Sequence, residues 1–165
     1  VGECGLDFFV PGLDVEQQEA IFIAHIRLAH ALNKPLIIHA RKATERVIQL
    51  LKIHVPTTGV IHSYSGSLEQ ARQLVDMGFM LGIGGPITYP RSNRLRAIIQ
   101  EIPLQFLLLE TDAPDQPMQG EQGQRNEPAK LPKVAHAVAE ACGLSFETVA
   151  AQTADNTRRL FGFSA

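Results

Sequence analysis

LIIH at residues 36–39 is a run of branched apolar residues that ends in a histidine, and GVIH at residues 59–62 repeats the pattern. Short apolar runs of this kind are typical of strands buried on both faces of a parallel sheet. Stretches with helical periodicity separate the runs, so strands alternate with helices along the chain. This alternation predicts an α/β fold with parallel strand pairing, because parallel neighbours need a crossover connection.

Polar residues at the predicted strands favour a barrel over an open doubly wound sheet. Active sites of (β/α)8 barrels lie at the carboxyl ends of the strands. Here Glu3, His39, His62 and Asp112 fall within or at the ends of four different strands. A complete TIM-type barrel needs about 250 residues, so the chain supplies about five of eight units. The strands are expected at residues 2–7, 36–39, 59–62, 79–85 and 107–112.

Capping signals predict where the helices begin and end. Asp14 is expected to cap a helix that stops at Asn33, and the box Ser67–Gln70 is expected to open another. Residues 113–132, rich in Pro, Gly and Gln, are expected to form a long loop. Further helices are expected around residues 47–51, at 93–102 and 133–142, behind Ser145 and, as a separate short helix, at 156–161.

The composition bounds the class of protein. The 165 residues, 45% of them hydrophobic and 19% charged, suit a single domain over residues 1–165 and exclude a disordered or collagen-like chain. The apolar runs are too short to span a bilayer. Two cysteines without a CxxC pair favour a reducing, cytoplasmic location. A formal charge of −2 argues against a tight non-specific grip on nucleic acid, but not against a nucleic acid substrate held by a metal.

The amino-terminal end carries a strand signal at once. The chain starts at Val1 without a methionine, and residues 2–7 already have a strand pattern. We therefore expect that further strand–helix units precede Val1 in the natural protein.

Two carboxylates and two imidazoles at neighbouring strands predict a site for a divalent ion. Each residue has a simpler interpretation: a lone histidine after a strand is more often a core residue, Gly-Glu-x-Gly is a weak turn signal, and Asp-x-Pro can cap a helix. Four such residues at the same end of successive strands favour a metal, because buried acids and imidazoles are costly unless a cation pairs them. Imidazole suits zinc, and carboxylate also suits magnesium and manganese.

Several motifs in order resemble the TatD family of metal-dependent hydrolases, most closely its YjjV-type branch. One of them alone is a weak signal, but the ordered set is specific and covers the chain from end to end. The motifs are GECGLD at residues 2–7, IIHAR at 37–41, IHSYSG at 61–66, ETDAP at 110–114, RNEP at 125–128 and NTRRLF at 156–161.

The resemblance implies a (β/α)8 barrel of the amidohydrolase kind and a metal-dependent deoxyribonuclease with two divalent ions (Mg, Mn or Zn). Glu3 would bridge the ions, His39 and His62 would hold one, and Asp112 would hold the other beside the attacking water as its general base. The family opens with a His-x-His pair, which this sequence lacks. The implied site therefore retains one ion.

The residues around these ligands are candidates for binding a phosphoester substrate such as DNA. Arg41, Ser63, Tyr64 and Arg125 are placed to meet phosphate oxygens, as is Ser65, although Arg41 can equally pair with a carboxylate of the scaffold. Tyr64 can also stack on a base, although an aromatic residue beside a strand end is more often a packing residue. Asn126 matches the family's motif in the last long loop, where it shapes the site or contacts substrate.

Two other interpretations stay open. The same site can polarise a carbonyl, which fits an amidohydrolase-type enzyme acting on a small ester, lactone or amide. The chain can also be an inactive fragment of a barrel. In that case its unpaired strand edges predict self-association, and no membrane partner is expected.

Overall fold

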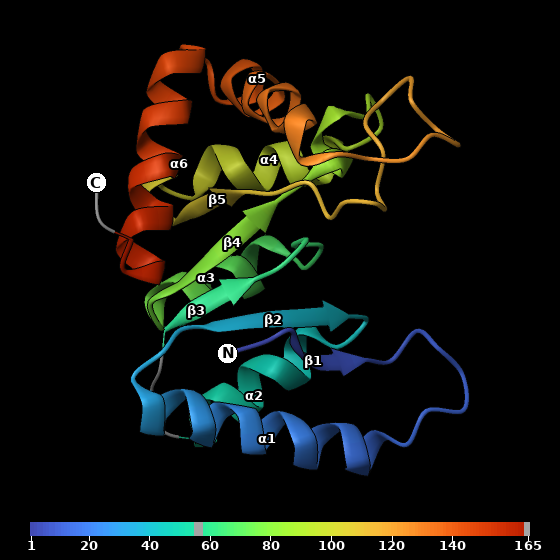
Figure 1. Cartoon of the computed structure of the whole chain (residues 1–165), viewed down its shortest axis with the longest axis vertical. Helices are drawn as coiled ribbons and strands as arrows, with labels where there is room; N and C mark the ends of the chain where they lie inside the picture. Colours follow the sequence, from blue (N-terminus) through green and yellow to red (C-terminus); the bar gives the residue numbers. More distant parts are fainter. Residues whose placement is uncertain (55–57, 164–165) are drawn as a thin grey trace. The chain divides into compact units, whose positions relative to one another are not determined.

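Five short strands alternate with helices along the chain (Figure 1). The computed structural model describes residues 1–54 and 58–163. The strands follow one another in a single sheet in chain order, and β1 to β4 pair in parallel. The predicted α/β class with five strand–helix units is confirmed. The strands are β1 Cys4–Asp7, β2 Leu36–Arg41, β3 Gly59–Ile61, β4 Phe79–Ile83 and β5 Leu107–Leu109.

The helices begin where the capping signals predict. The Asp14 side chain accepts the Gln17 N–H ahead of the first helix, and Asn33 ends that helix with a φ of 48°. Ser67 and Gln70 form the expected capping box. The helices are α1 Val15–Leu32, α2 Thr44–Ile53, α3 Leu68–Asp76, α4 Asn93–Glu101, α5 Leu131–Cys142 and α6 Phe146–Phe161, with 3-10 turns η1 Gly85–Thr88, η2 Leu104–Phe106 and η3 Pro128–Lys130.

Contacts divide the chain into two compact units, Val1–Leu81 and Gly82–Ala165. A single domain over residues 1–165 stays a prediction. Within the described residues, no helix is both long and apolar enough to cross a bilayer.

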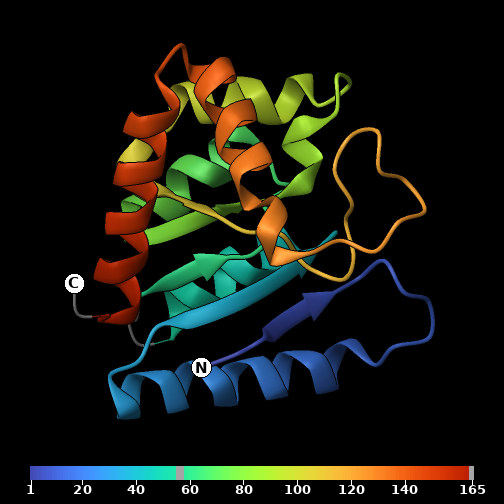
Figure 2. The same cartoon turned by 45° about the horizontal axis from the view of Figure 1, so that its top comes forward.

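The first unit buries one face of its sheet beneath α1, which lies along β1 (Figure 2). Successive side chains of a strand point to opposite faces, so every second residue of β1 and β2 enters this core. The intervening side chains, among them Asp7 and His39, face the other way and are less buried. The core here consists of Cys4, Leu6, Leu36, Ile38 and Ala40 from the strands and Phe22, Ile26 and Ala29 from α1.

The prediction of two separate helices behind Ser145 is wrong. One continuous helix, α6, covers both segments. Asn156 lies inside this helix with its side chain fully buried. Its Nδ2 donates to the carbonyl oxygens of Leu104 and Leu107, each at 2.8 Å. The amide thus ties α6 to the turn before β5 and does not start a new helix.

The predicted loop at residues 113–132 also contains η3, and α5 begins at Leu131, two residues earlier than expected. Pro132 fits there because the first turn of a helix leaves its N–H groups without helical partners.

Replacing Asn156 with alanine should lower the free energy of unfolding by about 2 kcal/mol, because two buried carbonyl oxygens lose their donor. Urea denaturation followed by circular dichroism measures this. Arg158→Ala on the exposed side of the same helix is the control, and equal stability of the two variants would contradict the anchoring role of Asn156.

Candidate metal centre

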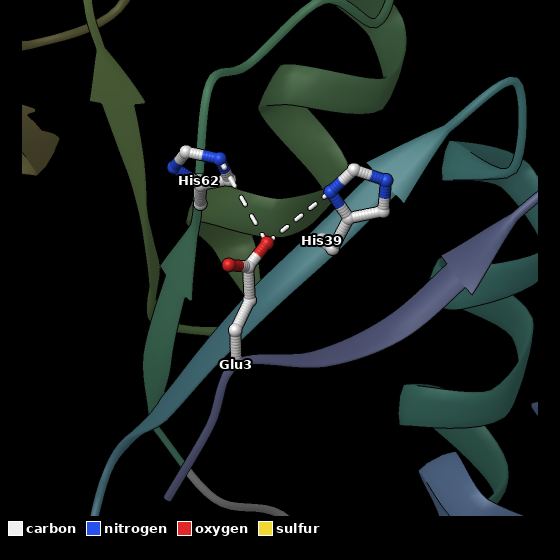
Figure 3. A group of neighbouring side chains, drawn as sticks. All are labelled: Glu3, His39 and His62. Carbon is white, nitrogen blue, oxygen red and sulfur yellow. Dashed lines mark ion pairs between the residues drawn. The ribbon is translucent and has the colours of Figure 1, made fainter. Parts of the chain in front are cut away.

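Glu3, His39 and His62 lie together on one face of the first unit's sheet (Figure 3). The Glu3 Oε1 atom is 3.2 Å from His39 Nδ1 and 3.8 Å from His62 Nε2. The His62 side chain is 14% exposed, whereas that of Glu3 is 50% exposed. The structure therefore brings together three of the four residues that the sequence nominates as metal ligands.

The parallel register explains the cluster. Cys4, Ile38 and Ile61 form one row across β1, β2 and β3. Glu3 precedes this row by one residue, and His39 and His62 follow it by one residue. Because side chains alternate between faces, all three point away from the face that α1 covers.

The expectation that the ligands share the carboxyl ends of their strands is wrong for two of them. Glu3 directly precedes β1, and His39 lies inside β2; only His62 directly follows its strand. Gly5 lies opposite His39 in the register, with a φ of 134°. A Cβ at Gly5 would lie 2.1 Å from the His39 carbonyl oxygen, so glycine is required for this close approach of β1 to β2.

The donor atoms fit a divalent ion in number, chemistry and spacing. Two imidazole nitrogens and one carboxylate oxygen, all within 4.8 Å of one another, form a mixed N/O set. Tetrahedral ligands at about 2.1 Å from an ion lie roughly 3.4 Å apart. The distances of 3.2 and 3.8 Å from Glu3 Oε1 bracket that value.

Asp7 is a site residue that the sequence analysis missed. Its Oδ2 is 3.2 Å from His39 Nε2, on the side of the ring opposite Glu3. Partial burial of Asp7 favours a higher pKa, but hydrogen bonds from the Phe9 N–H, His39 and the Val10 N–H outweigh it and hold the pKa below its usual value. The period of two at Glu3, Gly5 and Asp7, which places them on one face, is the signal that could have revealed it.

An ionised Asp7 favours the His39 tautomer with its proton on Nε2. A carboxylate only accepts hydrogen bonds, so with an ion bound at Nδ1, His39 would carry its proton on Nε2 and donate a hydrogen bond to Asp7. In that tautomer the Nδ1 lone pair would point to the side of Glu3, where an ion would bind. Carboxylates in this position orient metal-binding histidines in many proteins.

Cys4 is adjacent to Glu3 but takes no part in the cluster. Its side chain lies on the opposite, buried face, where Sγ donates to the Ile37 carbonyl oxygen. Burial raises the pKa of its thiol to about 11. The thiol is therefore protonated at neutral pH, and it lies on the face opposite the cluster.

Asp112, the fourth nominated ligand, belongs to the second unit. It lies three residues beyond β5 with a φ of 51°. Its Oδ2 accepts a hydrogen bond from Gln116 Nε2 at 2.6 Å. Its roles as ligand and general base stay predictions.

Arg41, Ser63 and Tyr64 of the nominated substrate-binding residues belong to the first unit: Arg41 ends β2, and Ser63 and Tyr64 lie in the turn after β3. The Arg41 guanidinium stacks on the Phe9 ring, 3.7 Å from its centroid. Ser63 directly follows His62 with a φ of 46°. Tyr64, by contrast, is buried and donates its hydroxyl to the Ser67 carbonyl oxygen. The contacts of Tyr64 support packing of the loop, whereas Arg41 is exposed to solvent.

Arg125 and Asn126, nominated with them, lie in the loop before α5. Arg125 is exposed, but Asn126 is 1% exposed. Its Oδ1 accepts the Glu127 N–H, and its Nδ2 donates within the loop that carries Asp112. These contacts support the shaping role expected for Asn126. The acceptors of Nδ2 are the carbonyl oxygens of Thr111, Asp115 and Gln116.

Comparison with known proteins identifies the family. The family model described as "TatD related DNase" matches residues 1–162. The chain belongs to the TatD family. Among TatD relatives, it is 41% identical over 162 residues to the uncharacterized metal-dependent hydrolase YjjV of Escherichia coli K12, covering 98% of this chain and 62% of that protein. The chain thus spans less than two thirds of the length of this relative.

Two further comparisons bear on the fold and on activity. The crystal structure of the E. coli K12 TatD homologue YjjV superimposes with a TM-score of 0.93 at 38% identity, covering 99% of this chain and 63% of that one. A protein of Escherichia fergusonii named 3'-5' ssDNA/RNA exonuclease TatD is 37% identical over 175 residues, covering 99% of this chain and 66% of that protein.

Replacing Asp7 with asparagine should weaken metal binding by about 10- to 100-fold, because the amide no longer fixes the His39 tautomer. Isothermal titration of the metal-free protein with Mn²⁺ measures the affinity, and ¹⁵N NMR of His39 reports which ring nitrogen carries the proton. Asp14→Asn is a matched control, since asparagine caps a helix as well as aspartate. Unchanged affinity and an unchanged His39 tautomer in Asp7→Asn would contradict the positioning role.

Proposed function

We propose that this chain is the metal-binding part of a hydrolase that cleaves phosphodiester bonds in nucleic acid. The observation that carries the proposal is the approach of Glu3 Oε1 to one nitrogen of His39 and one of His62 on a single sheet face. The name of the exonuclease relative supports a nucleic acid substrate. We place the activity with the whole protein, because the chain spans only part of its relatives.

Glu3, Asp7 and Asp112 would have different roles around the ion. A divalent ion bound there would supply Lewis-acid stabilisation of a phosphoryl oxygen and an acidified water. Glu3, His39 and His62 would hold this ion. Asp112, in the second unit, would be a ligand of a second ion, as the resemblance to the family implies. Asp7 would accept a hydrogen bond from His39 Nε2 and so leave Nδ1 to the ion. Asp112, as general base, would take the proton of the attacking water.

Substrate contacts follow from exposure and charge. Arg41 and Arg125 are exposed cations that would hold phosphate oxygens by charge-assisted hydrogen bonds. Ser63 would add a hydroxyl next to His62. Self-association through strand edges stays a prediction, which sedimentation of the purified protein tests. The cytoplasmic location also stays a prediction.

Full-length protein should cleave 5'-labelled single-stranded DNA in the presence of Mg²⁺ or Mn²⁺ and lose this activity with a chelator. Asp112→Asn should lower kcat by about 100-fold or more, because the general base is removed. Glu3→Gln should lower both activity and metal affinity. His30→Ala, an exposed histidine on α1, is the control and should leave both unchanged.

The same assay separates the other interpretations. Products shortened from the 3' end would match the named activity of the exonuclease relative. Turnover of small esters or lactones without DNA cleavage would contradict the proposal and favour the amidohydrolase interpretation. Absence of every activity in metal-loaded, folded protein would favour an inactive chain.

A further inference from the structure

The loop between β1 and α1 presents apolar side chains to solvent beside the metal centre. Phe9 is 54% exposed, and Val10 and Leu13 are also exposed. The loop starts directly after Asp7, the residue that contacts His39. A large exposed aromatic ring this close to a metal centre is a candidate for contact with a ligand.

One carboxylate ties this loop to the metal centre. Asp7 Oδ1 accepts the N–H groups of Phe9 at 2.8 Å and Val10 at 3.3 Å, while its Oδ2 contacts His39. The Phe8 N–H also donates to the Arg41 carbonyl oxygen at 2.9 Å. The backbone that carries Phe9 is therefore fixed relative to the histidine.

Arg41 completes the feature from the neighbouring strand. It pairs with Asp7 in the register of β1 and β2. Its Cζ atom is 3.7 Å from the centroid of the Phe9 ring, so the guanidinium stacks on the ring as a cation–π pair. An aromatic surface and a fixed positive charge thus meet at the same end of these two strands.

This pairing suits one unit of a single-stranded nucleic acid. Aromatic rings stack on the faces of unpaired bases, largely without regard to sequence. A guanidinium binds phosphate oxygens in a planar, two-pronged geometry and also stacks on flat rings. Bases inside a duplex are already stacked on their neighbours, so the pairing favours single strands.

We propose that Phe9 and Arg41 form a subsite that receives a nucleobase and the adjoining phosphate of a single-stranded polynucleotide next to the metal centre. This inference rests on the proposed phosphodiesterase function and assigns the residues that would hold one base and its phosphate. Phe9 provides the stacking surface, and Arg41 contacts the phosphate. Asp7 links the loop that carries Phe9 to His39.

The test compares a single-stranded oligothymidylate with an abasic strand of the same length, which keeps the phosphates but has no bases. In the full-length protein, Phe9→Ala should raise KM for the oligothymidylate about tenfold and leave kcat, KM for the abasic strand and Mn²⁺ affinity unchanged. Phe9→Trp should restore the low KM. Arg41→Ala should raise KM for both strands.

Leu13→Ala, which removes another exposed apolar side chain of the same loop, is the matched control and should change neither KM. If the wild type cleaves DNA and Phe9→Ala keeps the same ratio of KM values for the oligothymidylate and the abasic strand, this inference alone is overturned. Loss of Mn²⁺ affinity in Phe9→Ala would also overturn it, because Phe9 would then support the metal centre itself. Absence of both DNA cleavage and DNA binding in the wild type would overturn the proposed function as well.

Discussion

The register of the three parallel strands β1, β2 and β3 is the constraint on which the site depends. Shifting one strand by a single residue would turn its side chains to the opposite face and remove its ligand from the cluster. Gly5 permits the close approach of β1 to β2 in this register, because any side chain there would collide with the His39 backbone. The hydrophobic face beneath α1 and the polar face with Glu3 and His39 are thus set by the same alternation.

Two carboxylates gather around His39 on the polar face, an arrangement that favours binding of a cation. His39 lies between two carboxylates, Glu3 on one side of the ring and Asp7 on the other. Their oxygens approach different ring nitrogens, so the two acids serve different purposes. Glu3 faces His62 as well and is available to an ion, whereas Asp7 is engaged by the backbone of the following loop. The metal site and the loop that adjoins it are therefore parts of one hydrogen-bonded unit.

The sequence is sufficient to predict the α/β class, the capped helix starts and the two histidines that lie beside Glu3, because these follow from local patterns. His39 and His62 each end an apolar run, and Asp14 and Ser67 precede helices. Features that depend on tertiary contacts cannot be predicted from such local patterns. The role of Asp7 depends on its neighbour across the sheet. Asn156 resembles a residue between two helices in sequence, yet its amide bonds to Leu104 and Leu107 and leaves α6 unbroken.

The central claim is that Glu3, His39 and His62 bind one divalent ion together. Crystals of the full-length protein soaked in Mn²⁺ and measured for anomalous scattering test it most directly. The account predicts an anomalous peak at roughly 2.0–2.3 Å from a Glu3 oxygen, His39 Nδ1 and His62 Nε2. A fully loaded crystal whose metal peaks lie elsewhere, with these three side chains bound to none of them, would contradict it.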